Sequence, residues 1–276
     1  MGPGRETGAA LLDADIDAVS FTGSVATGHL VRERAAARGI KVQLEMGGKN
    51  PFVVLDDADV ETAVEAAVNG AFFSTGQRCT ASSRLIVTEG IHDQFVDALI
   101  ERMKGLKVDD PLKEGTAIGP VVDQRQLDQD LDYLDLGRKE GADLTWGGER
   151  LNRDTPGFFL QPALFTGATN DMRICREEIF GPIAAVVKVT DFDAALAAAN
   201  DTEFGLSAGI ATTSLNAART FRRRAQAGMV MINLPTAGVD YHVPFGGRKA
   251  SSYGPREQGR YAVDFYTTVK TAYARA

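Results

Sequence analysis

Apolar and polar positions alternate in a way that divides most of the chain into short β-type runs and longer helical segments. Runs rich in apolar and β-branched residues predict strands at Ala18–Thr22, Lys41–Glu45, Phe52–Leu55, Arg84–Thr88, Ile183–Val189, Ala208–Thr212 and Met229–Asn233. Helical spacing predicts helices at Val60–Phe73, Ile91–Lys104, Val122–Glu140, Asp191–Ala199 and Ser214–Ala225. Strands that alternate with helices are typical of an α/β fold with a largely parallel sheet.

The two ends of the chain depart from this pattern. Residues 1–40 predict a helix, a strand and a helix, and they open on a glycine-rich turn of the kind that normally follows a strand. We therefore expect the chain to start partway through a domain. The last stretch, Asp264–Ala274, predicts an isolated strand with nothing after it to pair with. A strand of this kind is suited to pairing with another subunit.

Composition narrows the class of protein. The 276 residues are 44% hydrophobic and 24% charged, which is enough for one large or two smaller globular domains. The formal net charge of −7 argues against a nucleic-acid partner. No apolar run approaches the ~20 residues that span a bilayer, and the N-terminus lacks the order of a signal peptide. The two cysteines, Cys79 and Cys175, are far apart and form no disulfide framework, so we expect a cytoplasmic protein.

One motif suggests hydrolase chemistry, but its context argues against it. Gly205–Gly209 matches the G-x-S-x-G pattern around a nucleophilic serine, here Ser207. That chemistry needs a turn from strand to helix, whereas a helix precedes this motif and a β-like run follows it. A connection built from small residues is the favoured interpretation.

Cys79 is the candidate nucleophile. It follows the predicted Val60–Phe73 helix in a loop of small and polar residues, Ser74–Thr80. A thiolate needs a dipole or a cation and access to substrate, and this loop suits that requirement better than it suits a buried apolar cysteine. Cys175 lies between two arginines without a comparable loop, so we interpret it as structural or exposed.

Two acidic segments are further candidates. Glu45 closes a strand and is followed by Gly47 and Gly48, at the end of a strand where α/β folds place ligand chemistry. An exposed turn is an equally good interpretation of that segment alone. Glu177 and Glu178 are adjacent carboxylates without evident further metal ligands, so a ribose-binding role is favoured over a metal site.

Five motifs, in this order, resemble the aldehyde dehydrogenase superfamily over essentially the whole chain. They are FTGS at Phe21–Ser24, LEMGGK at Leu44–Lys49, GQRCT at Gly76–Thr80, EEIFGP at Glu177–Pro182 and PFGGRK at Pro244–Lys249. The resemblance implies an aldehyde dehydrogenase-like catalytic domain with a parallel sheet and flanking helices. It also implies a partial Rossmann-like cofactor domain and a C-terminal oligomerisation strand.

The resemblance also assigns roles. Cys79 matches the thiol that attacks the aldehyde carbon, with its own N–H as half of the oxyanion hole. Glu45 matches the base that activates water to hydrolyse the thioester. The remaining matched positions are the nicotinamide contacts Glu178 and Phe180, the cofactor contacts Gly23, Ser24, Met46 and Gly47, and the substrate contact Phe245. The implied cofactor is NAD or NADP, and no metal is implied.

Substrate and assembly follow from the same resemblance. The segments around Cys79 and Phe245 are most similar to members that oxidise 2-oxoglutarate semialdehyde, a small-molecule aldehyde with a second carboxylate. The C-terminal strand, residues 264–274, implies a homo-oligomer. Val25 and Ala26 depart from the polar residues that are usual after Ser24, which leaves the phosphate contacts open.

The resemblance covers only the later part of a full-length member. It implies a partial NAD(P)-binding domain at 1–47, a catalytic domain at 48–250 and a tail at 251–276. The asparagine of the oxyanion hole and the lysine that contacts the adenosine ribose belong to the part ahead of residue 1. We therefore expect weak cofactor binding and little turnover from this chain alone, and a non-catalytic structural or binding subunit is the alternative.

Overall fold

The computed structural model describes residues 2 and 4–276, which form two compact units. The thiol unit, named for Cys79, is Gly48–Gly238. The carboxylate unit, named for Glu45, comprises the described residues up to Gly47 together with Val239–Ala276. The chain passes from one unit to the other after Gly47 and again after Gly238, so residues 239–250 belong to the carboxylate unit. The domain bounds expected from the sequence, with divisions after residues 47 and 250, stay a prediction.

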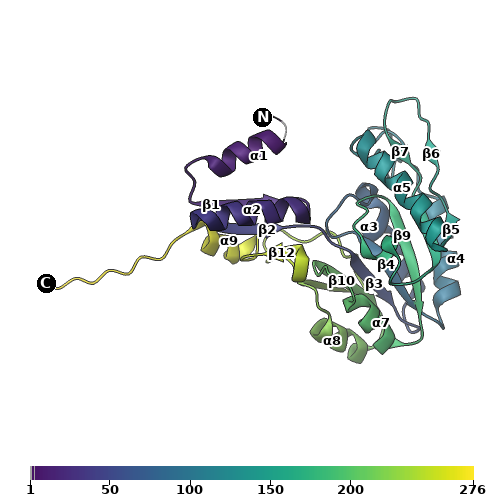
Figure 1. Ribbon diagram of the computed structural model, residues 1–276. Helices are drawn as coiled ribbons and strands as arrows, with labels where there is room; N and C mark the ends of the chain where they lie inside the picture. The colour runs from purple at the N-terminus through teal and green to yellow at the C-terminus, as the bar shows by residue number, and fades with distance from the viewer. Residues whose placement is uncertain (1, 3) are drawn as a thin grey trace. The chain divides into compact units, whose positions relative to one another are not determined.

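The thiol unit is built on one large sheet. Within its described residues, seven strands take the order β11-β10-β3-β4-β9-β8-β5. Figure 1 labels β3, β4, β5, β9 and β10 of this sheet. Neighbouring strands are parallel except for β5, which pairs antiparallel with β8 at one edge. The strands are β3 (Asn50–Val54), β4 (Ser82–Thr88), β5 (Asp143–Trp146), β8 (Ala163–Ala168), β9 (Ile183–Val189), β10 (Ser207–Ala211) and β11 (Met229–Ile232). The predicted α/β fold with a largely parallel sheet is confirmed.

Both faces of this sheet are covered. Successive residues of a strand point to opposite faces, so Val53 and Ile86 belong to one core cluster while Phe52 and Leu85 belong to the other. On the Phe52 side pack α3 (Val60–Phe72) and α4 (His92–Lys104). On the Val53 side pack α5 (Gln124–Glu140), α6 (Arg173–Arg176), α7 (Phe192–Asn200) and α8 (Leu215–Arg224). The short antiparallel pair β6 (Arg150–Leu151) and β7 (Phe159–Leu160) lies outside the main sheet.

Side chains at helix starts explain where several helices begin. Asp59, Asp123, Asp191 and Ser214 each accept a hydrogen bond from the backbone N–H three residues later, at α3, α5, α7 and α8 respectively. A cap of this kind typically contributes about 1 kcal/mol.

The carboxylate unit is smaller. Its elements are α1 (Gly4–Asp13), β1 (Ala18–Thr22), α2 (Val25–Arg38), β2 (Lys41–Glu45), the 3₁₀ turn η2 (Lys249–Ser251), β12 (Ser252–Tyr253) and α9 (Gly259–Tyr266). The strands β1 and β2 are parallel, and β12 adds antiparallel to β2. The buried core consists of Leu12, Val19, Val31, Ala35, Leu44 and Met46.

The predicted C-terminal strand is wrong at its beginning. Asp264–Tyr266 form the last turn of α9, because the apolar spacing around Phe265 buries that side chain against its own unit. Residues 267–276 are exposed and take no strand pairing within the described chain. No helix among the described residues is long and apolar enough to cross a membrane.

Candidate active site

Cys79 follows a turn of unusual backbone. The 3₁₀ turn η1 (Phe73–Gly76) contains Ser74 and Thr75 at φ 54° and 56°, and Gly76 at φ 63°. Left-handed residues other than glycine cost about 1–3 kcal/mol each and persist only where the surroundings hold them. Only glycine fits at position 76, since a Cβ there would collide with the carbonyl oxygen of Gly181. The loop is therefore held against the turn that contains Phe180.

The main chain at Cys79 is fixed from strand β3. Asn50 Nδ2 donates to the carbonyl oxygens of Cys79 and Ala81, both at 2.8 Å, and Asn50 Oδ1 accepts from Ser207 N at 3.0 Å. A Cβ on Gly48 would stand 2.6 Å from the Cys79 carbonyl oxygen, so only glycine allows this approach. Cys79 itself is half-buried, and both cysteines are thiols. Its position is thus defined by buried contacts while its side chain keeps partial access.

Glu178 lies beside this loop, in the same unit. Its Oε1 accepts from Gly48 N at 2.9 Å. Burial raises the pKa of Glu178, while the Gly48 hydrogen bond and the charge of Lys49 oppose that effect. The following Phe180 has φ 60° and exposes 36% of its surface. A carboxylate and an exposed ring are therefore presented next to the thiol loop.

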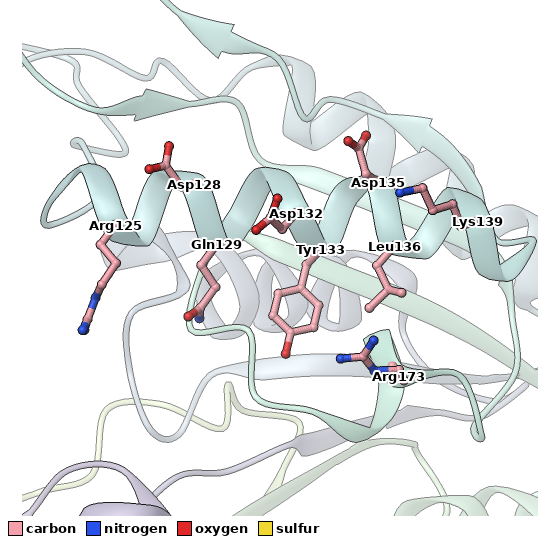
Figure 2. A pocket seen from close by; sticks show the side chains of 9 residues that line it. All are labelled: Arg125, Asp128, Gln129, Asp132, Tyr133, Asp135, Leu136, Lys139 and Arg173. Atoms are coloured by element: carbon pink, nitrogen blue, oxygen red, sulfur yellow. The ribbon is translucent and has the colours of Figure 1, made fainter.

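Glu177 faces a different way from Glu178. It pairs with Arg173 at 2.7 Å and accepts from the hydroxyl of Tyr133 at 2.7 Å. Figure 2 shows Tyr133 and Arg173 lining a surface pocket along α5. This pocket contains none of the predicted site residues. The two adjacent carboxylates therefore have different partners: Glu178 binds Gly48 near the thiol loop, and Glu177 binds Arg173 and Tyr133.

Lys49 is a buried amine that the sequence did not single out. It exposes 1% of its surface, and its Nζ has no hydrogen-bond partner among the described residues. Burial lowers its pKa to about 8, against opposing effects from Cys175 and Glu178. Its charge stabilises the ionised form of Glu178.

Glu45 belongs to the carboxylate unit, where it ends β2. It exposes 3% of its surface, accepts from Ser252 Oγ at 2.6 Å, and its Oε1 lies against the α-carbon of Gly246. Burial raises the pKa of Glu45 to about 7, and Glu257 adds to that rise. The hydrogen bond from Ser252 and the charge of Arg256 act in the opposite direction. A carboxyl group that titrates near neutrality is suited to act as a general base.

The other predicted contacts of this unit surround the β1–α2 turn. Ser24 caps α2 by accepting from Thr27 N at 3.3 Å, and both Gly23 and Ser24 are exposed. The turn before α2 is therefore open to solvent, as an anion site at a helix start requires. The side chain of Met46 is instead packed in the core, and Gly47 is buried.

The sequence matches the model of the aldehyde dehydrogenase family over residues 1–272. The chain belongs to the aldehyde dehydrogenase family.

Relatives in this family support the match. The chain is 47% identical to alpha-ketoglutaric semialdehyde dehydrogenase of Bacillus subtilis, over 99% of this chain and 57% of that protein. It is 44% identical to alpha-ketoglutarate semialdehyde dehydrogenase of Haloferax volcanii, over 99% of this chain and 57% of that protein. A crystal structure of betaine aldehyde dehydrogenase from Staphylococcus aureus in complex with NAD+ superimposes with a TM-score of 0.92 at 35% identity, over 96% of this chain and 53% of that one. The chain therefore spans about half the length of the relatives it matches.

The aldehyde dehydrogenase motifs fall into two groups in the structure. Cys79, Glu178 and Phe180 are brought together in the thiol unit through Gly48, Gly76 and Gly181. Glu45, Phe245, Ser24, Gly23, Met46 and Gly47 lie in the carboxylate unit. Phe245 is half-buried and its backbone pairs with Glu257.

Three supporting residues were not predicted: Asn50, Ser252 and Gly246. Asn50 holds the Cys79 carbonyl, while Ser252 and Gly246 contact Glu45. The sequence signal for Asn50 was its polar side chain at the start of the apolar β3 run. The partners of Glu45 come from more than 200 residues away, and sequence spacing does not reveal such contacts. Ser207 begins β10, fully buried, with its hydroxyl donating to Thr80 O at 3.5 Å.

Proposed function

We propose that this chain carries the thiol and the general base of an enzyme that oxidises an aldehyde to a carboxylic acid with NAD or NADP. The observation that supports it most strongly is the support of Cys79 by Asn50 and Gly48, next to Glu178 and Phe180. A loop strained at two non-glycine residues and fixed at its main chain is typical of a preorganised nucleophile.

The residues present fit a nicotinamide dinucleotide. The exposed turn at Gly23 and Ser24 suits the pyrophosphate, while the proposed contacts Met46 and Gly47, which follow β2, are buried. The carboxylate of Glu178 suits the ribose hydroxyls of the nicotinamide half, beside Phe180. When bound, the cofactor supplies the acceptor for the hydride that leaves the aldehyde carbon.

The chain's own residues perform the remaining steps. The Cys79 thiolate attacks the carbonyl carbon, and the oxygen becomes an oxyanion that the Cys79 N–H stabilises. As that oxyanion re-forms its carbonyl, a hydride leaves the carbon and a thioester remains on Cys79. Glu45 takes a proton from water, which attacks the thioester, so that the acid and the thiol are released. A pKa of about 7 suits Glu45 to this task.

A cofactor-independent reaction tests both roles in the chain as it stands. An activated ester such as p-nitrophenyl acetate should acylate Cys79, with a burst of one nitrophenolate per chain, followed by slower turnover. Cys79→Ser should abolish the burst, and Cys175→Ser is the matched control that should retain it. Glu45→Gln should leave the burst and slow turnover by about 10²–10³, as loss of a general base does. A burst that persists in Cys79→Ser, or acylation of Cys79 no faster than that of glutathione, would contradict the proposal and favour a non-catalytic structural subunit.

The proposed substrate is an aldehyde with a distal carboxylate, 2-oxoglutarate semialdehyde. Two relatives at 47% and 44% identity carry that name, which supports this choice. Preincubation with this semialdehyde should slow alkylation of Cys79 by iodoacetamide more than an equal concentration of butyraldehyde does. Equal protection by the two aldehydes would contradict the substrate but not the thiol chemistry.

Assembly and location complete the proposal. We propose a cytoplasmic homo-oligomer that uses residues 267–274, whose Val269 and Tyr273 are 98% and 95% exposed. The two thiols and the absence of a disulfide between them in the described chain suit a reducing compartment. Sedimentation of the chain with and without residues 267–276 tests the assembly, and an unchanged mass would contradict it.

A further inference from the structure

We propose that Asp130 is a positioning residue whose neutral carboxyl group supports the turn Ile179–Gly181, and with it Phe180 and Glu178. This inference rests on the proposed function of that turn. It adds a residue that contacts neither substrate nor thiol and that lies on helix α5.

The position of Asp130 on α5 is exceptional. The buried residues of the helix are Leu127, Asp130, Leu134 and Gly137, which form a stripe at helical spacing. Asp130 is the one ionisable residue in this stripe. Asp130 exposes none of its surface. A carboxyl group is almost never fully buried without a specific partner, because its desolvation costs free energy.

The contacts of Asp130 converge on one turn. Its Oδ1 accepts from Gln126 Nε2 at 2.8 Å, and the same nitrogen donates to the carbonyl oxygen of Ile179 at 3.1 Å. Gln129 Nε2 donates to that oxygen as well, at 2.7 Å. A Cβ on Gly181 would collide with the Asp130 carboxyl group, which therefore lies directly against the Gly181 α-carbon. Helix α5 thus holds the turn on both sides of Phe180.

This turn needs support from outside itself. Phe180 is left-handed at φ 60°, and its partly exposed ring gains little burial in return. Gly181 O touches Gly76, three residues before Cys79, and Glu178 binds Gly48 N. A shift of the turn would therefore reach both the ribose-binding carboxylate and the thiol loop.

The neutral form of Asp130 fits this environment. Burial raises its pKa to about 7, against the hydrogen bond from Gln126. Its Oδ2 has no hydrogen-bond partner within the part of the chain that the structure describes. A protonated carboxyl group there resembles an asparagine amide in size and in having one acceptor.

The test compares Asp130→Asn with Asp130→Val, by hydrogen exchange of the 177–182 backbone and by the rate of Cys79 acylation. The matched control is Asp132→Val, the same substitution at an exposed position of α5 (Figure 2). We expect Asp130→Val to speed exchange at 177–182 by 10-fold or more while exchange in α4 stays within twofold. We expect Asp130→Asn to keep both readouts within twofold of the wild type.

Three results would overturn the proposal. One is exchange at 177–182 in Asp130→Val that equals that of Asp132→Val. Another is an increase in hydrogen exchange in Asp130→Val that is uniform across the whole sheet, as a purely structural residue would give. The third is an Asp130→Asn variant as perturbed as Asp130→Val, which would mean that the charged form acts. If Asp130→Val fails to fold, Gln126→Leu removes the hydrogen bond to Asp130 together with the one to the Ile179 carbonyl oxygen. It should raise exchange at the same turn, and unchanged exchange there would overturn the proposal. The exchange readout does not depend on the thiol chemistry, so failure of acylation in the wild type contradicts the proposed function alone.

Discussion

The two units solve the problem of holding a reactive side chain in different ways. In the thiol unit, Cys79 is fixed at its main chain by Asn50 and Gly48, and a seven-stranded sheet with two core clusters stands behind it. In the carboxylate unit, Glu45 ends the central strand of a three-stranded sheet whose buried apolar cluster, among the described residues, has six members. Stability rises with the buried core, so the proposed nucleophile lies in the more self-sufficient unit. The proposed base lies in a unit that depends more on each of its core side chains.

A matched pair of core substitutions tests this difference most strongly. Leu44 and Leu85 are both fully buried leucines of central strands, one in each unit. Truncation to alanine typically costs about 3–5 kcal/mol. We expect Leu44→Ala to unfold the carboxylate unit alone, and Leu85→Ala to lower stability while the thiol unit stays folded. Hydrogen exchange resolved by peptide measures both effects. Equal local unfolding in the two variants would contradict the difference in stability between the units.

The pH dependence of stability should have the same sign in both units. The pKa values of Glu45 and Asp130 are each raised to about 7 by burial. Between about pH 4 and 7 the unfolded chain loses these protons while the folded chain keeps them, so stability falls as the pH rises and levels off above 7. At about 1.4 kcal/mol per unit of pKa, the loss is roughly 3 kcal/mol for Glu45 and roughly 4 kcal/mol for Asp130.

Neutral variants separate the two contributions. Glu45→Gln should flatten the pH dependence of unfolding in the carboxylate unit, and Asp130→Asn should flatten it in the thiol unit. Denaturant titrations at pH 4, 5.5 and 7 measure this. If the free energy of unfolding of the wild type rises between pH 4 and 7, and neither variant changes that slope, both assignments are contradicted.

Removal of the Asn50 side chain tests the support of the thiol loop. Asn50→Ala leaves the carbonyl oxygens of Cys79 and Ala81 and the N–H of Ser207 without this partner, in a buried place. We expect a loss of about 2 kcal/mol in stability and a slower burst of acylation. Asn69→Ala, at a half-buried position of α3, is the control, since the substitution keeps the Asn69 carbonyl oxygen that accepts from Arg78 and removes none of the Asn50 hydrogen bonds. A burst rate equal to that of the wild type would show that Cys79 needs no such support.

The smallest effect is expected at Glu45, the proposed base. Ser252 donates to Glu45 and lowers its pKa, so Ser252→Ala should raise the midpoint for thioester hydrolysis by less than one pH unit. This corresponds to about 1 kcal/mol or less of differential stabilisation. The pH profile of turnover after the burst measures it. A midpoint that moves down would mean that another group sets the pKa of Glu45.

Sequence patterns predicted the regular parts of both units better than their contacts. The bounds of β1, β2 and β9 are those expected from their apolar runs, because these strands are uninterrupted. The strand β8 was missed because Gly167, at φ 65°, breaks its pattern, and β12 is only two residues long. The start of the tail was predicted wrongly because Asp264–Tyr266 fit a strand and a helix equally well, and Phe265 is buried only once the unit has folded.

The candidate site divides in the same way. Cys79, Glu45 and Glu178 stand in motifs that single them out. The groups that hold them do not, because Asn50, Ser252 and Gly181 act through tertiary contacts. Asp130 left one trace in the sequence, an acidic residue in the apolar stripe of α5. Helical spacing alone does not say that its partner is a turn about 50 residues away.

Gly48 and Gly76 also set limits on how this loop can change. At each of them a backbone oxygen occupies the space that any side chain would need. A library that randomises both positions should return glycine at both. Selection for a new aldehyde would then have to act on side chains that face outward, such as Phe180, while the main-chain path around Cys79 stays constant.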